Sequence, residues 1–119
     1  MKSISQFLYL LILLSGCEYS YDYSYTVTNK SDRQIHVFVK TFEIDSTFLI
    51  QKDSTKKLFI TWHGVEGSKG PYSRNVNVDL DSFKVTKQDI IKSKRDYLKN
   101  DAWTFINGDY STTVTNEEF

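Results

Sequence analysis

The fold of this chain is indicated most clearly by the stretch Trp103-Thr-Phe-Ile-Asn-Gly-Asp-Tyr-Ser-Thr-Thr-Val-Thr115. Two runs rich in aromatic and β-branched residues flank the pair Asn107-Gly108. Such runs are typical of strands, and an Asn-Gly pair readily adopts the positive φ angles of a tight type I′ turn. The stretch therefore predicts a β-hairpin with strands at 103–106 and 110–115.

Alternating apolar and polar residues predict further strands towards the N-terminus. The clearest lies at 19–28, where four tyrosines and a valine share one face. The other expected strands lie at 34–42, 47–51, 57–62, 75–80 and 83–85. The short polar turn at 29–32 predicts that the first two strands form a hairpin. In the strand at 75–80, the residues expected to face the core are Val76, Val78 and Leu80.

One short helix is expected near residues 87–99. Thr86 and Asp89 have the spacing of a capping box, with Asp in place of the usual Glu or Gln. The apolar residues that recur at helical spacing are Ile90, Ile91, Tyr97 and Leu98. Seven or eight short strands with one short helix predict an all-β fold, an immunoglobulin-like (Ig-like) antiparallel β-sandwich. The Cys and Trp spacing of antibody domains is absent, so this comparison concerns shape alone.

Length and composition limit the classes of function. The 119 residues suit one domain, and a formal net charge of zero provides no overall field that would attract nucleic acid. A single Cys excludes an internal disulfide and a Cys-rich zinc site, and two His leave little material for another metal centre. We therefore expect neither a nucleic-acid partner nor a bound metal or other cofactor.

The N-terminus has the pattern of a lipoprotein signal. Lys2 precedes eight consecutive apolar residues at 7–14, a stretch too short to span a bilayer and typical of a secretory signal peptide. The following Leu14-Ser15-Gly16-Cys17 resembles the bacterial lipobox. That resemblance implies removal of residues 1–16 and attachment of lipid to Cys17, which would anchor the chain in the membrane. Residues 17–24 would then form a tether or the start of the first strand, and residues 25–119 the β-sandwich domain.

A wider resemblance rests on the lipobox, the Tyr-rich strand that ends in Thr28-Asn-Lys-Ser31, and the closing segment 103–119. Together these features resemble small lipoproteins of Bacteroidota. The resemblance implies an Ig-like β-sandwich in the cell envelope, and it carries no catalytic residues. Glu18 stands where an Asp would mark inner-membrane retention in enteric bacteria, so the outer membrane is favoured, with the domain periplasmic or surface-exposed.

Three regions are candidate contact surfaces. The loop Gly64–Arg74 contains three Gly and the only Pro, and its Tyr72 is the residue expected to contact a partner. This loop lacks the Gly-x-x-x-x-Gly-Lys-Ser/Thr pattern of a phosphate loop and is expected to join two strands as a long hairpin loop. The tyrosines at 19–25 form either a platform for stacking sugars or part of the core. Basic residues outnumber acidic ones six to two across 84–99, which indicates either contact with anionic glycans or lipids or the solvated face of a helix.

Four single residues are further candidates. His36 is expected to face solvent from the middle of a strand, and His63 is a candidate ligand or base without metal-like spacing. Asp45-Ser46-Thr47 and Asp53-Ser54-Thr55 resemble the acceptor sites for protein O-glycosylation in Bacteroidota. Ser46 and Ser54 are therefore candidate sites of glycosylation.

The function expected from these features is that of a non-enzymatic binding or accessory module at the cell envelope, with a protein or glycan partner. One alternative is an inhibitor or immunity protein that blocks an envelope-directed toxin or hydrolase. Another is a small glycan-acting enzyme, which would need two carboxylates about 5–10 Å apart across a cleft. The sequence offers Glu43, Glu66 and Asp79 for this purpose but does not place them in space.

Overall fold

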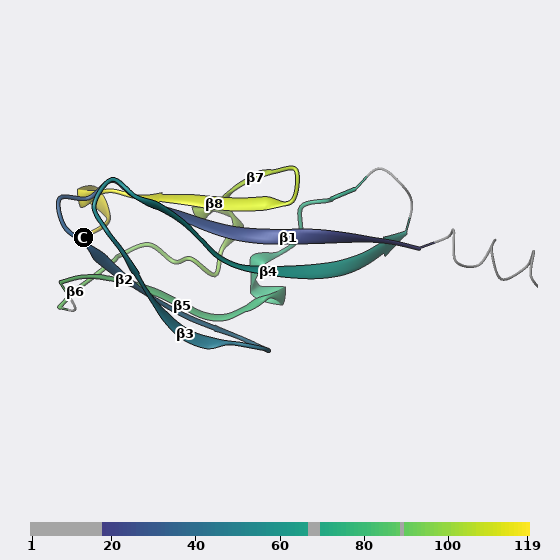
Figure 1. Cartoon of the computed structure of the whole chain (residues 1–119), viewed down its shortest axis with the longest axis horizontal. Helices are drawn as coiled ribbons and strands as arrows, with labels where there is room; N and C mark the ends of the chain where they lie inside the picture. The colour runs from purple at the N-terminus through teal and green to yellow at the C-terminus, as the bar shows by residue number, and fades with distance from the viewer. Residues whose placement is uncertain (1–17, 67–69, 89) are drawn as a thin grey trace, which may run out of the picture.

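The computed structural model describes residues 18–66, 70–88 and 90–119, which form a β-sandwich of two four-stranded sheets (Figure 1). The first sheet consists, in spatial order, of β4 (Thr55–Glu66), β1 (Glu18–Asn29), β8 (Asp109–Val114) and β7 (Thr104–Ile106). The second consists of β3 (Asp45–Ile50), β2 (Ile35–Thr41), β5 (Leu80–Lys87) and β6 (Ile91–Lys92). The described residues also include the 3₁₀ helices η1 (Val76–Val78), η2 (Asn100–Ala102) and η3 (Asn116–Glu118). The predicted β-sandwich is confirmed.

One pair of neighbouring strands departs from the antiparallel arrangement that the sequence predicts. β1 runs parallel to β8, whereas it runs antiparallel to β4 on its other side. The hydroxyls of Ser24 and Thr26 donate hydrogen bonds of 2.7 and 2.8 Å to the Asp109 carboxylate, which fixes this parallel register. The first and last strands therefore lie side by side in the middle of the first sheet.

The predicted hairpin at 103–115 is confirmed as β7 and β8. Asn107 and Gly108 have φ angles of 49° and 86°, the positive values that the Asn-Gly pair predicts. The turn also packs on β1, since the Ser24 N–H donates a 2.9 Å hydrogen bond to the Gly108 carbonyl. A Cβ atom at Gly108 would lie 2.7 Å from the Asp22 carbonyl oxygen, so this position requires glycine on two grounds.

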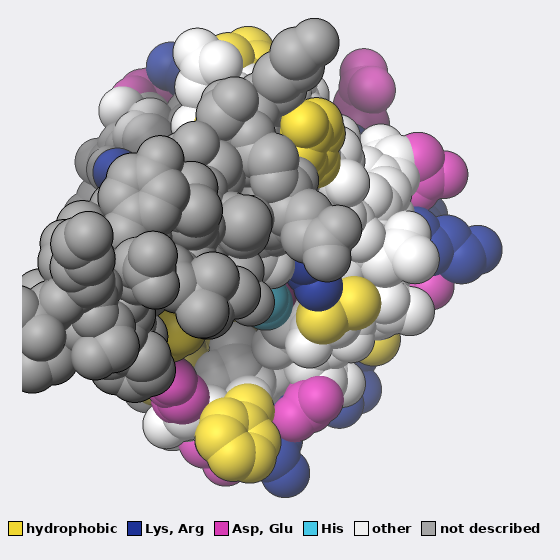
Figure 2. Space-filling model, turned by 90° about the vertical axis from the view of Figure 1, so that its right-hand side faces the viewer, with side chains coloured by type: hydrophobic (Ala, Val, Ile, Leu, Met, Phe, Trp, Pro, Cys, Tyr) yellow, Lys and Arg dark blue, Asp and Glu magenta, His cyan; other side chains and the backbone are white. Residues whose placement is uncertain are grey.

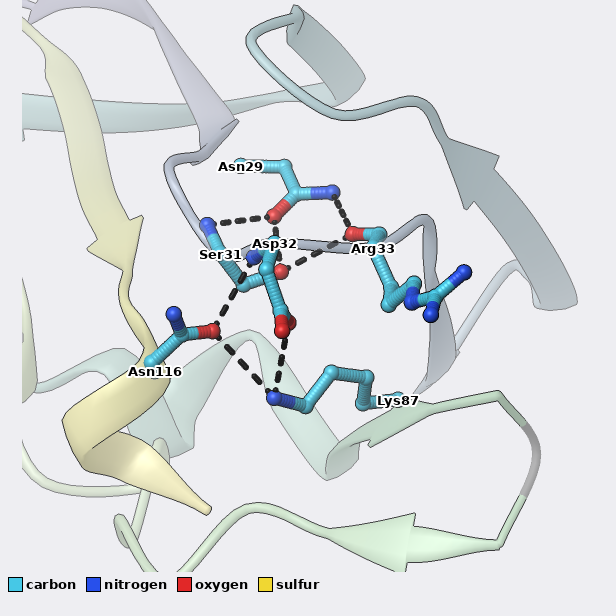
Figure 3. A network of polar contacts seen from close by, with 6 residues as sticks. All are labelled: Asn29, Ser31, Asp32, Arg33, Lys87 and Asn116. Carbon is cyan, nitrogen blue, oxygen red and sulfur yellow. Dashed lines mark hydrogen bonds and ion pairs between the residues drawn. The ribbon is translucent and has the colours of Figure 1, made fainter.

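The predicted hairpin between the first two strands is wrong, because β1 and β2 belong to different sheets. The chain crosses between the sheets at Asn29, whose side chain is fully buried. The Asn29 amide donates to the Arg33 carbonyl at 2.8 Å, and its oxygen accepts from the Ser31 N–H and hydroxyl at 3.0 and 2.6 Å (Figure 3). The same amide also donates to the Ile50 carbonyl at 3.0 Å. These side-chain bonds replace the strand-to-strand bonds that a hairpin would have made.

The segment between β4 and β5 is not the predicted strand 75–80. It forms η1, with Val76 buried and Val78 exposed, and it carries the chain from the first sheet to the second. The expected hairpin loop at 64–74 is therefore part of a crossing between sheets. β5 begins at Leu80 and continues through Asp81 and Ser82, so the expected strand 83–85 has no break from Leu80 before it. Apolar and polar residues alternate here as they would in a strand, but of the two valines only Val76 is buried in the core.

The short helix expected near 87–99 is also absent from the part of this segment that the structure describes. β5 continues to Lys87, and the chain then turns back as β6. The backbone that follows is satisfied by other segments, with Ser93 N–H donating to the Val85 carbonyl at 2.8 Å and Lys94 N–H to the Glu118 carbonyl at 2.6 Å. Tertiary hydrogen bonds therefore replace those of a helix.

A cluster of aromatic rings lies in the core between the sheets. The ring of Tyr25 lies 4.7 Å from Phe59, 5.0 Å from Tyr110 and 5.4 Å from Trp103, measured between centroids. Aromatic pairs of this kind contribute about 0.5–1.5 kcal/mol each beyond the burial of their surface. Tyr23 and Tyr25 are fully buried, so of the two alternatives for the tyrosine run the structure assigns these residues to the core.

β1 and β4 extend beyond the other strands as a two-stranded arm, at the end where the chain enters β1 (Figure 1). The arm comprises residues 18–22 and 62–66, paired from Glu18 with Glu66 to Asp22 with Trp62. The described residues of the segment 17–24 therefore form the start of the first strand. Among the residues described, no helix has the length and apolar character needed to cross a membrane.

Candidate functional site

A cavity of about 210 Å³ lies where the β2–β3 turn, β4 and the residues after η1 approach one another. We call it the recess. Its lining consists of Thr41, Phe42, Glu43, Ile44, Phe59, Ile60, Thr61, His63, Val78 and Asp79. Residues from both sheets contribute to it, so the recess exists only because the sandwich has closed.

The polar part of the recess is a chain of three side chains. The Nε2 atom of His63 lies 2.6 Å from Oδ1 of Asp79, and the Tyr25 hydroxyl donates a 2.7 Å hydrogen bond to Oδ2 of the same carboxylate. The Asp79 side chain is only 6% exposed, and a buried carboxylate is stable only when its oxygens accept strong hydrogen bonds. Because a carboxylate accepts and does not donate, His63 carries its hydrogen on Nε2.

Tyr25 is held in its neutral form. Burial raises the pKa of its hydroxyl far above the ordinary value, and the hydrogen bond to Asp79 and the charge of that carboxylate raise it further. The tyrosine therefore acts as a permanent donor to Asp79. The ring of His63 also packs edge-to-face with the ring of Tyr23, with centroids 5.4 Å apart.

Local backbone geometry places each wall of the recess. Asp79 follows η1, where its N–H donates a 3.1 Å bond to the Val76 carbonyl and turns its side chain towards β4. On the opposite side, the Thr41 hydroxyl accepts the N–H groups of Glu43 and Ile44 at 3.1 and 3.0 Å. That capped turn presents Phe42 to solvent.

Exposed apolar side chains surround this polar centre. Phe42 is 98% exposed, and Ile60 and Val78, which also line the recess, are more than half exposed. Trp62, two residues beyond Ile60 on β4, is 66% exposed. Figure 2 views the molecule from the arm end and shows hydrophobic side chains beside acidic ones on the described part of this face. Concave sites that combine apolar walls with a few fixed polar groups are typical of binding sites.

Tyr72, the residue predicted to contact a partner, lies outside the lining of the recess. Its side chain is half-exposed, and its carbonyl accepts a 3.0 Å hydrogen bond from the buried Tyr23 hydroxyl. The segment that crosses between the sheets is also held at Arg74. Its N–H donates to the Tyr110 hydroxyl at 2.6 Å, and its carbonyl accepts from the same hydroxyl at 2.9 Å. The structure therefore presents Tyr72 on a backbone that the core holds in place.

The candidate glycosylation sites differ in accessibility. Ser46 is exposed on the edge strand β3. Ser54 is half-buried in the turn before β4, where its N–H donates to the Gln51 carbonyl and its own carbonyl accepts from Asn29. The lipidation candidate Cys17 lies outside the described residues.

The two histidines have different surroundings from those the sequence predicts. His36 is half-buried, whereas the sequence predicts a solvent-facing side chain, and its ring stacks on that of Phe38 with centroids 6.4 Å apart. His63 is the candidate residue whose partner could not be predicted from the sequence. Asp79 is 16 residues away, in a segment predicted as a strand that would have turned it outwards.

Of the three carboxylates considered for glycan chemistry, Glu43 and Asp79 line the same recess, whereas the side chain of Glu66 is not described. The described residues contain no group of three or more His, Cys, Asp or Glu side chains placed to hold a metal ion. No family model matches the chain, and neither a curated protein nor a solved structure is significantly similar to it. The roles of these residues therefore rest on their geometry.

Proposed function

We propose that this protein is a lipid-anchored, non-enzymatic binding module of the bacterial cell envelope that holds its partner at the recess. The observation that carries the proposal is the recess itself, in which exposed Phe42, Ile60 and Val78 surround the fixed pair His63 and Asp79. An exposed phenylalanine gains free energy when a partner covers it, and the histidine supplies one directional polar contact.

Binding rather than catalysis is supported by the state of the polar groups. Both oxygens of Asp79 already accept hydrogen bonds within the protein, and Tyr25 is held protonated. Among the described residues, no serine, threonine or cysteine side chain forms a hydrogen bond with His63, so the arrangement lacks the nucleophile that a His–Asp pair would activate. Asp79 therefore serves to orient the imidazole of His63.

The anchor is proposed from the lipobox. Lipid on Cys17 would be attached at the residue directly before β1, at the tip of the arm. Two or three acyl chains hold a protein durably, whereas one holds it marginally. The arm would then stand between the outer membrane and the sandwich, with the recess beside it.

A site-specific crosslinking experiment tests the proposal. A photoreactive phenylalanine analogue replaces Phe42 in the full chain, expressed in its native host, and in a matched variant it replaces Ile106, an exposed apolar residue on the edge strand β7. We expect an envelope protein or glycan to be crosslinked at position 42 and not at position 106. Equal crosslinking at both positions would contradict the assignment of the recess. A crosslinked toxin or envelope hydrolase would favour the inhibitor alternative.

A further inference from the structure

A second cavity of about 530 Å³ lies at the β5 edge of the second sheet, away from the recess. It forms because β6 pairs only with Thr86 and Lys87 of β5. Beyond β6, the Ser93 N–H donates one further bond to the Val85 carbonyl of β5. The chain then continues to β7 in the first sheet. The cavity lies beside β5 where this short pairing ends. Its volume is within the range of small-molecule sites, about 300–1,000 Å³.

Three aromatic residues line this cavity. Phe38 contributes an exposed ring from β2, and Phe83 and Tyr97 contribute buried ones whose centroids lie 5.2 Å apart. Phe38 lies on the outer face of the sheet, paired with Lys84, and offers an apolar surface to the body of a small ligand. Phe83 and Tyr97 lie in the core, where the ring centroid of Trp103 is 5.1 Å from that of Phe83.

Three basic residues line the same cavity, and none of the described residues that line it is acidic. Arg95 is already engaged, since it pairs with Glu118 and donates a 3.0 Å bond to the Thr112 hydroxyl. Lys84 and Lys92, from β5 and β6, are exposed and form no ion pair within the described part of the chain. Two cations therefore remain available to a ligand at an aromatic surface.

Thr86 supplies an independent observation. It lines the cavity between the two lysines in sequence, and it is only 8% exposed. Its hydroxyl oxygen is buried and has no hydrogen-bond partner among the residues described. A buried hydroxyl without a partner costs free energy, and few polar groups in native proteins are left in this state.

We propose that this cavity binds an organic carboxylate with an apolar body. The carboxylate would lie near Lys84 and Lys92 and accept a hydrogen bond from the Thr86 hydroxyl, while the apolar body would pack on the ring of Phe38. The excess of basic residues across 84–99 would then be explained in part by binding of this carboxylate, and not by the solvated face of a helix. This site is separate from the recess and does not depend on the function proposed for it.

The test uses the full chain in phosphatidylcholine nanodiscs, with empty nanodiscs subtracted, and measures binding by calorimetry. The probes are naphthalene-2-carboxylate and octanoate, each compared with the corresponding neutral alcohol. We expect at least one carboxylate to bind about tenfold more tightly than its alcohol, because a charge-assisted hydrogen bond is lost in the alcohol. Equal binding of acid and alcohol, or binding of neither acid at millimolar concentration, would overturn the proposal.

Two variants locate the bound carboxylate. The double variant Lys84→Gln/Lys92→Gln should weaken binding about tenfold, and Thr86→Val should weaken it with no loss of thermal stability. The matched control is Lys52→Gln/Lys57→Gln, which removes two exposed lysines that do not line the cavity. An equal loss of affinity in the control would mean that overall charge, and not this cavity, attracts the anion. Thermal melts of each variant show whether the fold is retained.

Discussion

The imidazole of His63 and the carboxylate of Asp79 lie 2.6 Å apart. This contact joins β4, an edge strand of the first sheet, to the residue directly before β5 of the second sheet. Tyr25 extends this connection into the core, because its hydroxyl bonds to the second oxygen of the same carboxylate. The recess and the aromatic core are therefore coupled through one buried acidic residue. Changes at Asp79 are expected to affect both.

Asp79→Ala is expected to reduce the free energy of unfolding by about 2–3 kcal/mol, because it leaves the Tyr25 hydroxyl and His63 Nε2 without their acceptor. Asp81→Ala, an exposed carboxylate two residues along the chain, is the matched control and should change stability by less than about 0.5 kcal/mol. Urea denaturation measures both. Equal effects of the two variants would show that the buried hydrogen bonds contribute little.

Gly108→Val should cost about 1–3 kcal/mol, since a β-branched residue is strained at a positive φ and its Cβ would meet the Asp22 carbonyl. Asn107→Gly is the control, because glycine tolerates the φ of 49° at that position. The control should retain the melting temperature of the parent protein to within a few degrees. A Gly108→Val variant with an unchanged melting temperature would refute this account of the turn.

Asn29→Ala should destabilise the protein by about 2–3 kcal/mol, because several buried polar groups lose their partners at the crossing between sheets. Asn116→Ala provides a control within the same network (Figure 3), as that side chain is exposed and accepts only from Asp32 N–H and Lys87. Its loss should cost less than about 1 kcal/mol. Chemical denaturation of both variants would disprove the prediction if their midpoints coincide.

Stability should decrease as the pH rises above about 10. Burial raises the pKa of both Tyr25 and Tyr97 above the ordinary value of 10.0, so these tyrosines ionise in the unfolded chain before they ionise in the folded protein. The folded state then binds more protons than the unfolded state, and the free energy of unfolding falls by up to about 1.4 kcal/mol per pH unit for each tyrosine. Below pH 10 this contribution is fully present.

Tyrosine-to-phenylalanine variants isolate this effect. Tyr25→Phe and Tyr97→Phe should each reduce the slope of stability against pH between pH 10 and 11, whereas Tyr72→Phe, at a half-exposed position, should leave it unchanged. Urea denaturation at several pH values provides the slopes. Identical slopes in all four proteins would exclude the two buried hydroxyls as the cause of alkaline destabilisation.

Cys17→Ala should release the protein from the membrane fraction of its native host, because the proposed lipid is attached to that thiol. Ser15→Ala retains a small residue in the lipobox and should leave the protein membrane-bound. Fractionation followed by intact-mass measurement distinguishes the two variants. Retention of the Cys17→Ala variant in the membrane would contradict lipid anchoring.

The alternation of side chains was sufficient to predict most strands and the sandwich. A strand with apolar residues on one face must bury that face, and the run from Tyr19 to Val27 carries this information locally. The turn at Asn107-Gly108 was equally predictable, since its backbone conformation depends on the residues of the turn itself. The segment 87–99 was not, because its helical spacing of apolar residues competes with hydrogen bonds offered by Val85 and Glu118.

The sequence by itself determined that the chain forms the strands of a β-sandwich and the turn at Asn107-Gly108, because strand and turn preferences act between near neighbours. Only the tertiary structure decided that β1 and β2 lie in different sheets, that the first and last strands run parallel, and that His63 meets Asp79. The cavity around Lys84 and Lys92 was decided in the same way. These relationships join residues far apart in the chain, and buried polar groups such as Asn29 and Asp79 can satisfy their hydrogen bonds only once distant segments have packed together.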